Sequence, residues 1–176
     1  MEQSQGPATP AGMNNRISDS GKTLSRDIAA AFGEAVAILI RSPFHHATFL
    51  PELEWMLAPG IASGQYAIAH RTDSMTGAQT AIGFVTWAMV SDEVNQRLLT
   101  TNSRPKLKPL EWRSGKTAWL IEAAGDAEAT RNLIATLMDR QFAVSGLNIM
   151  QQGPDGKFRA TRIAPKVVKP ADAAVN

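Results

Sequence analysis

The sequence predicts a mixed α/β (α+β) domain, in which helices flank a largely antiparallel sheet. Segments with apolar residues at helical spacing alternate with short apolar runs that are typical of strands. A strong turn signal, Gly153-Pro154-Asp155-Gly156, separates two such runs and indicates a hairpin. The predicted order is helix, helix, strand, strand, helix, strand, helix, strand, strand, which favours one mixed sheet covered by helices.

Local signals set the bounds of the elements in the first half of the chain. Pro43 is expected to end the first helix, because the residue before a proline is pushed out of helical geometry. Pro59 and Gly60 are expected to end the second helix. The last strand of this half is almost continuously apolar, as in a central strand that is covered on both faces. In order, these elements are a helix over about 25–41, a helix over about 49–58, a strand over 65–71 and a strand over 80–90.

Two helix caps organise the second half. Ser91 and Asp126 each precede a segment of helical character, and both residue types accept hydrogen bonds from the first free N–H groups of a helix. The region between the first of these helices and the next strand holds Pro105 and Pro109 and is expected to be irregular. The expected elements are a helix from Ser91 to about 101, a strand over 116–123, a helix from Asp126 to about 140, and strands over 145–151 and 157–163.

Composition bounds the domain organisation and the partners. Polar residues with Gly and Pro predict flexible tails over 1–24 and 166–176, which leaves a single domain over 25–165. The net charge of +2 is too small to predict binding to nucleic acid. With no cysteine, thiolate catalysis and cysteine-ligated metal are excluded. We find no signal-peptide pattern and no apolar stretch long enough to span a membrane, so we expect a cytoplasmic protein.

Histidine is the first candidate for chemistry, since its ordinary pKa lies near neutrality. The chain has three histidines, and His45 and His46 are adjacent in the turn that follows the first helix. They are either two surface histidines of a polar turn or the source of a general base. Metal binding fits less well, because adjacent side chains point in different directions and no paired ligand spacing stands nearby. His70 has no motif around it and is expected to be structural or exposed.

Glu122 is the second candidate, because it interrupts an otherwise apolar strand. A buried carboxylate must find a partner or lose its charge. Glu122 can therefore orient a histidine, neutralise the charge of an arginine, or form an ordinary ion pair at the strand end. No phosphate-binding loop is found, because Gly21-Lys22-Thr23 and Gly115-Lys116-Thr117 both lack the first glycine of the P-loop pattern. The tryptophans are interpreted as packing residues.

Several short elements, in order, carry a resemblance to a known family. They are Ser42-Pro43-Phe44-His45, Leu57-Ala58-Pro59, Gln65-Tyr66, Trp87-Ala88-Met89-Val90-Ser91, Glu111-Trp112-Arg113-Ser114-Gly115 and Trp119-Leu120-Ile121-Glu122. In this order they resemble the RTX toxin-activating lysine acyltransferases, and the resemblance covers roughly 32–142. The resemblance implies a GNAT-like fold and transfer of a fatty acyl chain from acyl-carrier protein to internal lysines of an RTX protoxin. It implies that His45 and Glu122 are catalytic. It implies no permanently bound cofactor and no metal, with the acyl-acyl-carrier protein as co-substrate, and it leaves a homodimer open.

Two departures from the family pattern keep alternatives open. Glu122 stands where the family has aspartate, and Ala123-Ala124-Gly125-Asp126 replaces the family's Ala-Pro-Phe-Gly. One alternative is therefore a catalytically impaired member that acts as a binding or escort module. Another is an ordinary acyl-CoA-dependent GNAT enzyme, although the pyrophosphate-binding turn of that family is not found. Candidates for the wall of an acyl groove are the strand around Phe84–Met89 and the helix with Trp55 and Met56.

Overall fold

The computed structural model describes residues 19–45 and 47–165 of the 176-residue chain. Residues 1–18, His46 and residues 166–176 lie outside the described residues, and with them most of the predicted tails. The helices are α1 (Asp19–Arg41), η1 (Leu50–Glu52), α2 (Leu53–Met56), α3 (Ala58–Ala62), α4 (Asp92–Thr100), η2 (Pro109–Glu111) and α5 (Ala127–Arg140). The strands are β1 (Tyr66–Thr72), β2 (Gln79–Val90), β3 (Thr117–Gly125), β4 (Leu147–Gln152) and β5 (Phe158–Ile163).

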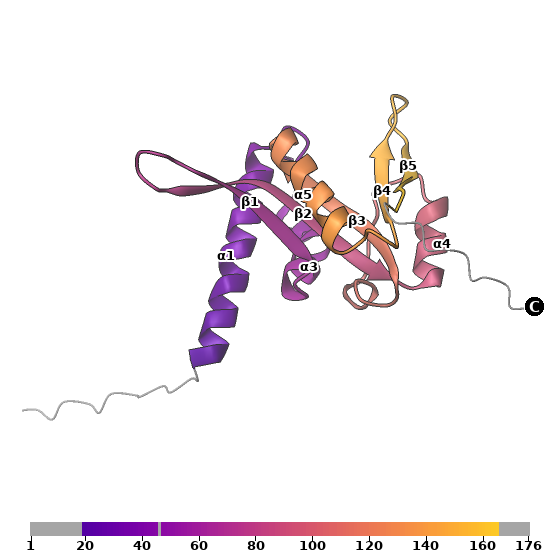
Figure 1. Ribbon diagram of the computed structural model, residues 1–176. Helices are drawn as coiled ribbons and strands as arrows, with labels where there is room; N and C mark the ends of the chain where they lie inside the picture. Colours follow the sequence, from indigo (N-terminus) through magenta and orange to yellow (C-terminus); the bar gives the residue numbers. More distant parts are fainter. Residues whose placement is uncertain (1–18, 46, 166–176) are drawn as a thin grey trace, which may run out of the picture.

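The predicted fold class is confirmed. The strands form one five-stranded sheet in the order β1-β2-β3-β4-β5. Neighbouring strands pair antiparallel except β3 and β4, which are parallel. Helices cover the sheet on both faces (Figure 1). This mixed, mostly antiparallel sheet is consistent with a GNAT-like α+β fold.

Most elements lie within a few residues of their predicted bounds, and two differ more. The first helix begins at Asp19 and therefore includes residues 19–24, which were expected to belong to the tail. The second helix does not end at Pro59 and Gly60. Instead the helix is interrupted at Leu57, and a second short helix, α3, follows with Pro59 in its first turn. A proline is accommodated there because the first turn needs no N–H donor from that position.

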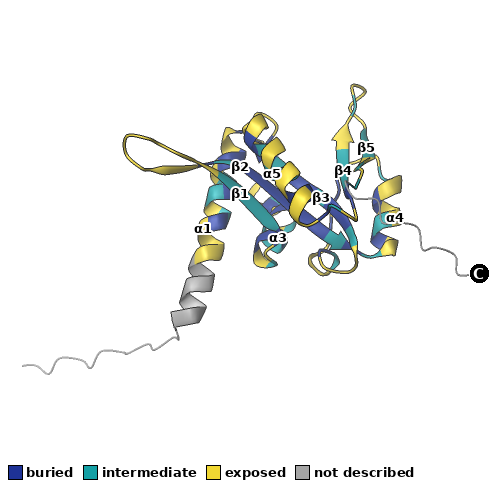
Figure 2. Cartoon of the chain, in the orientation of Figure 1, coloured by how far each residue is buried: buried dark blue, intermediate teal, exposed yellow. Residues whose placement is uncertain are grey.

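Two apolar layers hold the sheet between helices. On one face, α1, α2 and α3 pack against Phe84 of β2 and Ala124 of β3. On the other, α5 packs against Val85 and Trp87 through residues that include Leu137. β2 is buried along most of its length because it is covered from both sides, as its apolar run predicts (Figure 2). The alternation of side chains along β2 thus assigns successive residues to opposite layers.

The sheet is splayed between β3 and β4. Of the residues in these two strands, only Trp119 and Asn148 form a pair. Beyond that pair the strands diverge, and the hairpin of β4 and β5 stands apart from the rest of the sheet (Figure 1). Toward the C-terminal ends of β3 and β4 the two strands no longer pair with each other. No helix within the described residues is long and apolar enough to cross a membrane.

Candidate active site

A tight turn after α1 positions the histidine that the sequence analysis singled out. The His45 N–H donates to the Ser42 carbonyl oxygen at 3.0 Å, with Pro43 at the second position of the turn. Proline is favoured there because its fixed φ suits that position. The turn brings the two side chains together, and Ser42 Oγ lies 2.8 Å from His45 Nδ1. Both residues are buried, with His45 only 8% exposed.

A β-bulge in β3 brings Glu122 to the same face. β2 residue Thr86 pairs with Glu122 and Trp87 pairs with Leu120, so Ile121 is the extra residue. Strict alternation would put Glu122 beside Leu120, in the layer under α5. Because the bulge shifts the alternation by one residue, Glu122 and Ile121 both lie on the opposite face. Glu122 is thereby aimed at the turn that carries His45.

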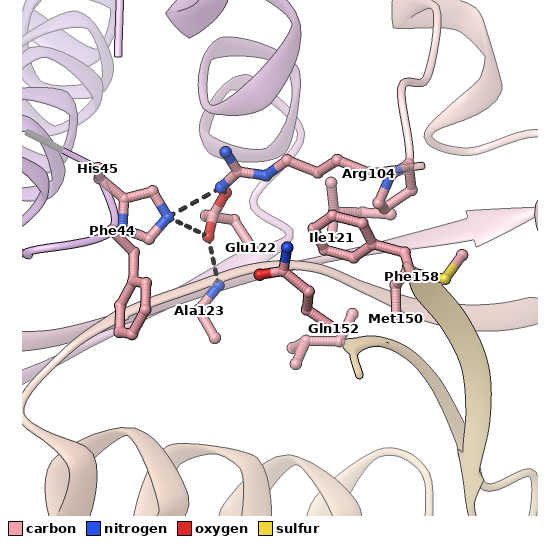
Figure 3. Close-up of a pocket in the computed structure, with 11 residues that line it drawn as sticks. Phe44, His45, Arg104, Ile121, Glu122, Ala123, Met150, Gln152 and Phe158 are labelled. Carbon is pink, nitrogen blue, oxygen red and sulfur yellow. Dashed lines mark hydrogen bonds and ion pairs between the residues drawn. The ribbon is translucent and has the colours of Figure 1, made fainter. Parts of the chain in front are cut away.

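Three polar side chains converge at this point (Figure 3). His45 Nε2 lies 3.0 Å from Glu122 Oε1. Arg104, from the irregular segment before η2, donates from Nη2 to Glu122 Oε2 and lies 2.8 Å from His45 Nε2. The Ala123 N–H donates to Glu122 Oε1 at 3.0 Å. The buried carboxylate, 5% exposed, therefore has both a cationic and a neutral donor.

The donors and acceptors of this cluster limit what His45 can do. A guanidinium has only N–H groups to offer, so a hydrogen bond from Arg104 requires an unprotonated Nε2. In the neutral ring the proton is then on Nδ1, which donates to Ser42 Oγ. A proton on Nε2 would instead be donated to Glu122. The two ring nitrogens thus have distinct partners, and Nε2 is the one that faces the charged groups.

A cavity of about 320 Å³ opens beside the cluster, lined in part by β3 and the β4–β5 hairpin. His45, Glu122 and Arg104 form its polar end, and apolar side chains form much of the remainder (Figure 3). Those apolar residues come from the turn, the irregular segment and strands β3 to β5. They are Phe44, Pro105, Leu120, Ile121, Ala123, Met150 and Phe158. The cavity can therefore hold an apolar chain with its polar end against His45.

His45 and Glu122, the two predicted catalytic residues, are in contact in the structure. Both partners considered for Glu122, a histidine and an arginine, are present together. Arg104 itself was missed, because it lies in an irregular segment and belongs to no motif. The other described histidine, His70, is exposed and pairs with Glu34 on α1. No group of three or more potential metal ligands occurs among the described residues.

The residues expected to form the wall of an acyl groove do not line this cavity. Phe84 and Trp87 are buried in the two apolar layers, and Met56 is buried against α1. Trp55 contacts the irregular segment, with Lys106 Nζ 5.1 Å from its ring centre. The cavity therefore lies not along the central strand, as predicted, but beside β3 and the β4–β5 hairpin.

The mixed, mostly antiparallel sheet flanked by helices is consistent with a GNAT-like fold. Comparison with protein families gives the particular group. The model of the RTX toxin acyltransferase family matches residues 25–164, and the chain belongs to that family. It is therefore an acyltransferase, and the family implies an RTX toxin as its substrate. A comparison with curated proteins gave no match.

Proposed function

We propose that this protein takes a fatty acyl chain from acyl-carrier protein and attaches it to internal lysine ε-amines of an RTX-type toxin, which activates the toxin. The observation that carries the proposal is the buried contact between His45 Nε2 and Glu122 Oε1, at the polar end of an apolar cavity. The proposal includes the domain of residues 25–165 as the catalytic unit and the cytoplasm as its location.

His45 acts as the general base in this proposal. A lysine amine is mostly protonated at neutral pH, because its ordinary pKa is about 10.4. It must lose a proton before or during attack on the thioester carbonyl. The ammonium proton goes to water, and Nε2 takes a second proton from the nitrogen as it attacks, since Nε2 is the nitrogen on the side of the carboxylate and the cavity. General base catalysis of this kind contributes roughly a hundredfold to ten-thousandfold in rate.

Ser42 and Glu122 contact different nitrogens of the imidazole and have different roles. Ser42 Oγ accepts the hydrogen bond from Nδ1 and so keeps Nε2 free of its proton before the reaction. Once Nε2 has taken the proton from the amine, Glu122 Oε1 accepts the new N–H and stabilises the imidazolium. The hydroxyl rather than the carboxylate thus selects the tautomer, because each contacts a different nitrogen.

The apolar part of the cavity supports a fatty acyl group as the cargo. Its volume of about 320 Å³ lies at the lower end of ligand-pocket sizes and suits one narrow chain. Phe158 and Met150 lie along the side away from His45 (Figure 3). An acyl chain entering between them and β3 would bring its thioester to the polar end.

The test is intact-mass spectrometry of an RTX-type toxin co-expressed with wild type, with His45→Ala, or with His70→Ala. His70→Ala is a matched control, because it removes a histidine that also pairs with a glutamate but lies on the surface. We expect a fatty-acyl mass increase with wild type and His70→Ala, located on lysines by peptide mapping, and no increase with His45→Ala. Full acylation by His45→Ala would refute the role of His45.

A second arm of the experiment tests the donor. Purified wild type is incubated with the toxin and either acyl-acyl-carrier protein or the matching acyl-CoA. We expect product with the carrier protein. Product only with acyl-CoA would favour an ordinary GNAT enzyme, and toxin binding with neither product would favour an escort module.

A further inference from the structure

Arg104 is the one lysine or arginine among the described residues that line the cavity. Its guanidinium lies beside the ring of His45 and the carboxylate of Glu122 (Figure 3). The side chain is 34% exposed, whereas those of His45 and Glu122 are almost fully buried. A partly exposed cation that lines the cavity can contact a bound substrate as well as Glu122.

In the free protein, Nη2 of Arg104 occupies the position that an attacking amine needs. A general base must come within about 2.6–3.2 Å of the atom whose proton it removes. Nη2 already lies 2.8 Å from His45 Nε2, within that range. The amine can therefore reach Nε2 only if the guanidinium moves aside.

The backbone around Arg104 is anchored, whereas its side chain can rotate. Its segment has no regular secondary structure around residue 104, and the long side chain can rotate. The segment is nevertheless anchored, because Pro105 and Leu107 are buried and the Phe158 N–H donates to the Asn102 carbonyl oxygen at 3.1 Å. The backbone at Arg104 therefore stays beside the cavity, and rotation of the side chain is enough to move the guanidinium away from Nε2.

That displacement brings the guanidinium to the acyl carbonyl. In a near-attack arrangement the amine nitrogen and the carbonyl carbon are about 3–3.5 Å apart. The carbonyl oxygen is a further ~1.2 Å from that carbon. When the guanidinium moves away from Nε2 to make room for the amine, it comes within hydrogen-bonding reach of this oxygen. The Ala123 N–H, a backbone donor at the same place, is already engaged by Glu122.

We infer that Arg104 is a catalytic residue that binds the carbonyl oxygen of the acyl donor while negative charge develops on it. The inference rests on the proposed function. The lysine nitrogen attacks the thioester carbon, the π electrons move to oxygen, and Arg104 donates hydrogen bonds to that oxyanion as Nε2 takes the amine proton. The carbonyl then re-forms, the C–S bond breaks, and the protonated His45 returns the proton to the leaving thiolate. The products are an amide and a thiol.

The test measures kcat and KM for the acyl donor with wild type, Arg104→Ala and Arg104→Lys. Loss of one oxyanion donor lowers kcat about 10²- to 10³-fold. We expect a loss of that order in Arg104→Ala, with KM changed only severalfold and kcat partly restored by added methylguanidine. Arg104→Lys keeps a cation beside Glu122 and so protects the fold. Its kcat should lie between those of wild type and Arg104→Ala, because an ammonium is a shorter, single-point donor.

Arg97→Ala is the matched control, because Arg97 also pairs with a glutamate, Glu111, but does not line the cavity. Its kcat should equal that of wild type. The inference is overturned if Arg104→Ala keeps kcat within threefold of wild type, or if only KM rises. A loss of kcat in Arg104→Ala that methylguanidine does not relieve, accompanied by a lowered melting temperature, would also overturn it. If wild type itself gives no acylated product, the proposed function fails first, so the two failures are distinguishable.

Discussion

Shortening Glu122 to aspartate tests whether the distance between the carboxylate and His45 matters. The substitution keeps the charge and removes one methylene. It also introduces the residue that the resembling family carries at this position, so a sequence comparison would predict little effect. The geometry predicts the opposite, because the bulged strand and the turn after α1 hold Glu122 Oε1 3.0 Å from His45 Nε2 with the longer side chain.

The magnitude follows from the contact distances. Removing one carbon–carbon bond withdraws the carboxylate by up to ~1.5 Å along the side chain. A contact of 3.0 Å then opens well past the hydrogen-bonding range. A misplacement of about 1 Å costs on the order of a hundredfold in rate, or about 2.7 kcal/mol of transition-state stabilisation. We therefore expect kcat to fall about a hundredfold in Glu122→Asp.

The assay measures the initial rate of acyl transfer at saturating donor, and mass spectrometry quantifies the acylated toxin. Glu111→Asp is the control, because it shortens another carboxylate that accepts from an arginine. Its kcat should stay at the wild-type value. Circular dichroism and thermal unfolding check that Glu122→Asp is folded. A folded Glu122→Asp with wild-type kcat would refute the reasoning, since the separation from His45 would then not limit the reaction.

Three further predictions concern stability. Thr86→Val should raise the free energy of unfolding in urea by about 1 kcal/mol, because the buried Thr86 hydroxyl has no hydrogen-bond partner within the described chain; a decrease would show that it has one. Gly60→Ala should lower that free energy by about 1–3 kcal/mol, since a Cβ there would lie 2.7 Å from Trp112 Cζ3, and an unchanged urea midpoint would contradict this. Hydrogen bonds from Arg97 hold the pKa of Glu111 below its ordinary 4.5, so the stability they contribute is present above that pH and is lost as the pH falls below it. The melting temperature of wild type should therefore fall more steeply in acid than that of Glu111→Gln. If melting temperature depends on pH in the same way for both proteins, the Arg97–Glu111 pair does not contribute to stability.

Local signals predicted most of the fold because their causes are local. Asp126 illustrates this, since a side chain that accepts from the Glu128 and Ala129 N–H groups needs only its own helix. Glu122 was also accessible to sequence reasoning, because a carboxylate in an apolar strand must be paired. The spacing of Ser42 and His45 within a proline turn could have revealed their contact, although no role was assigned to Ser42.

The remaining features of the site depend on contacts distant in sequence. Arg104 meets His45 across 59 positions, and nothing in its irregular segment distinguishes it from neighbouring Lys106 or Lys108. The bulge at Ile121 likewise has no signal in the local sequence, since there is no glycine at that position. It is detectable only from the pairing of β3 with β2. The cavity was sought along β2, because an apolar run gives no sign of where neighbouring strands part.

The single residue pair between β3 and β4 has a consequence for how the molecule opens. Strands β2 and β3 are joined by a long ladder, so their amide protons should exchange with solvent mainly through global unfolding. The β4–β5 hairpin is paired within itself but weakly attached to the sheet. Its amide protons should exchange through a smaller, more frequent opening. We therefore expect the wall of the cavity formed by β3 to be more rigid than the wall formed by the β4–β5 hairpin.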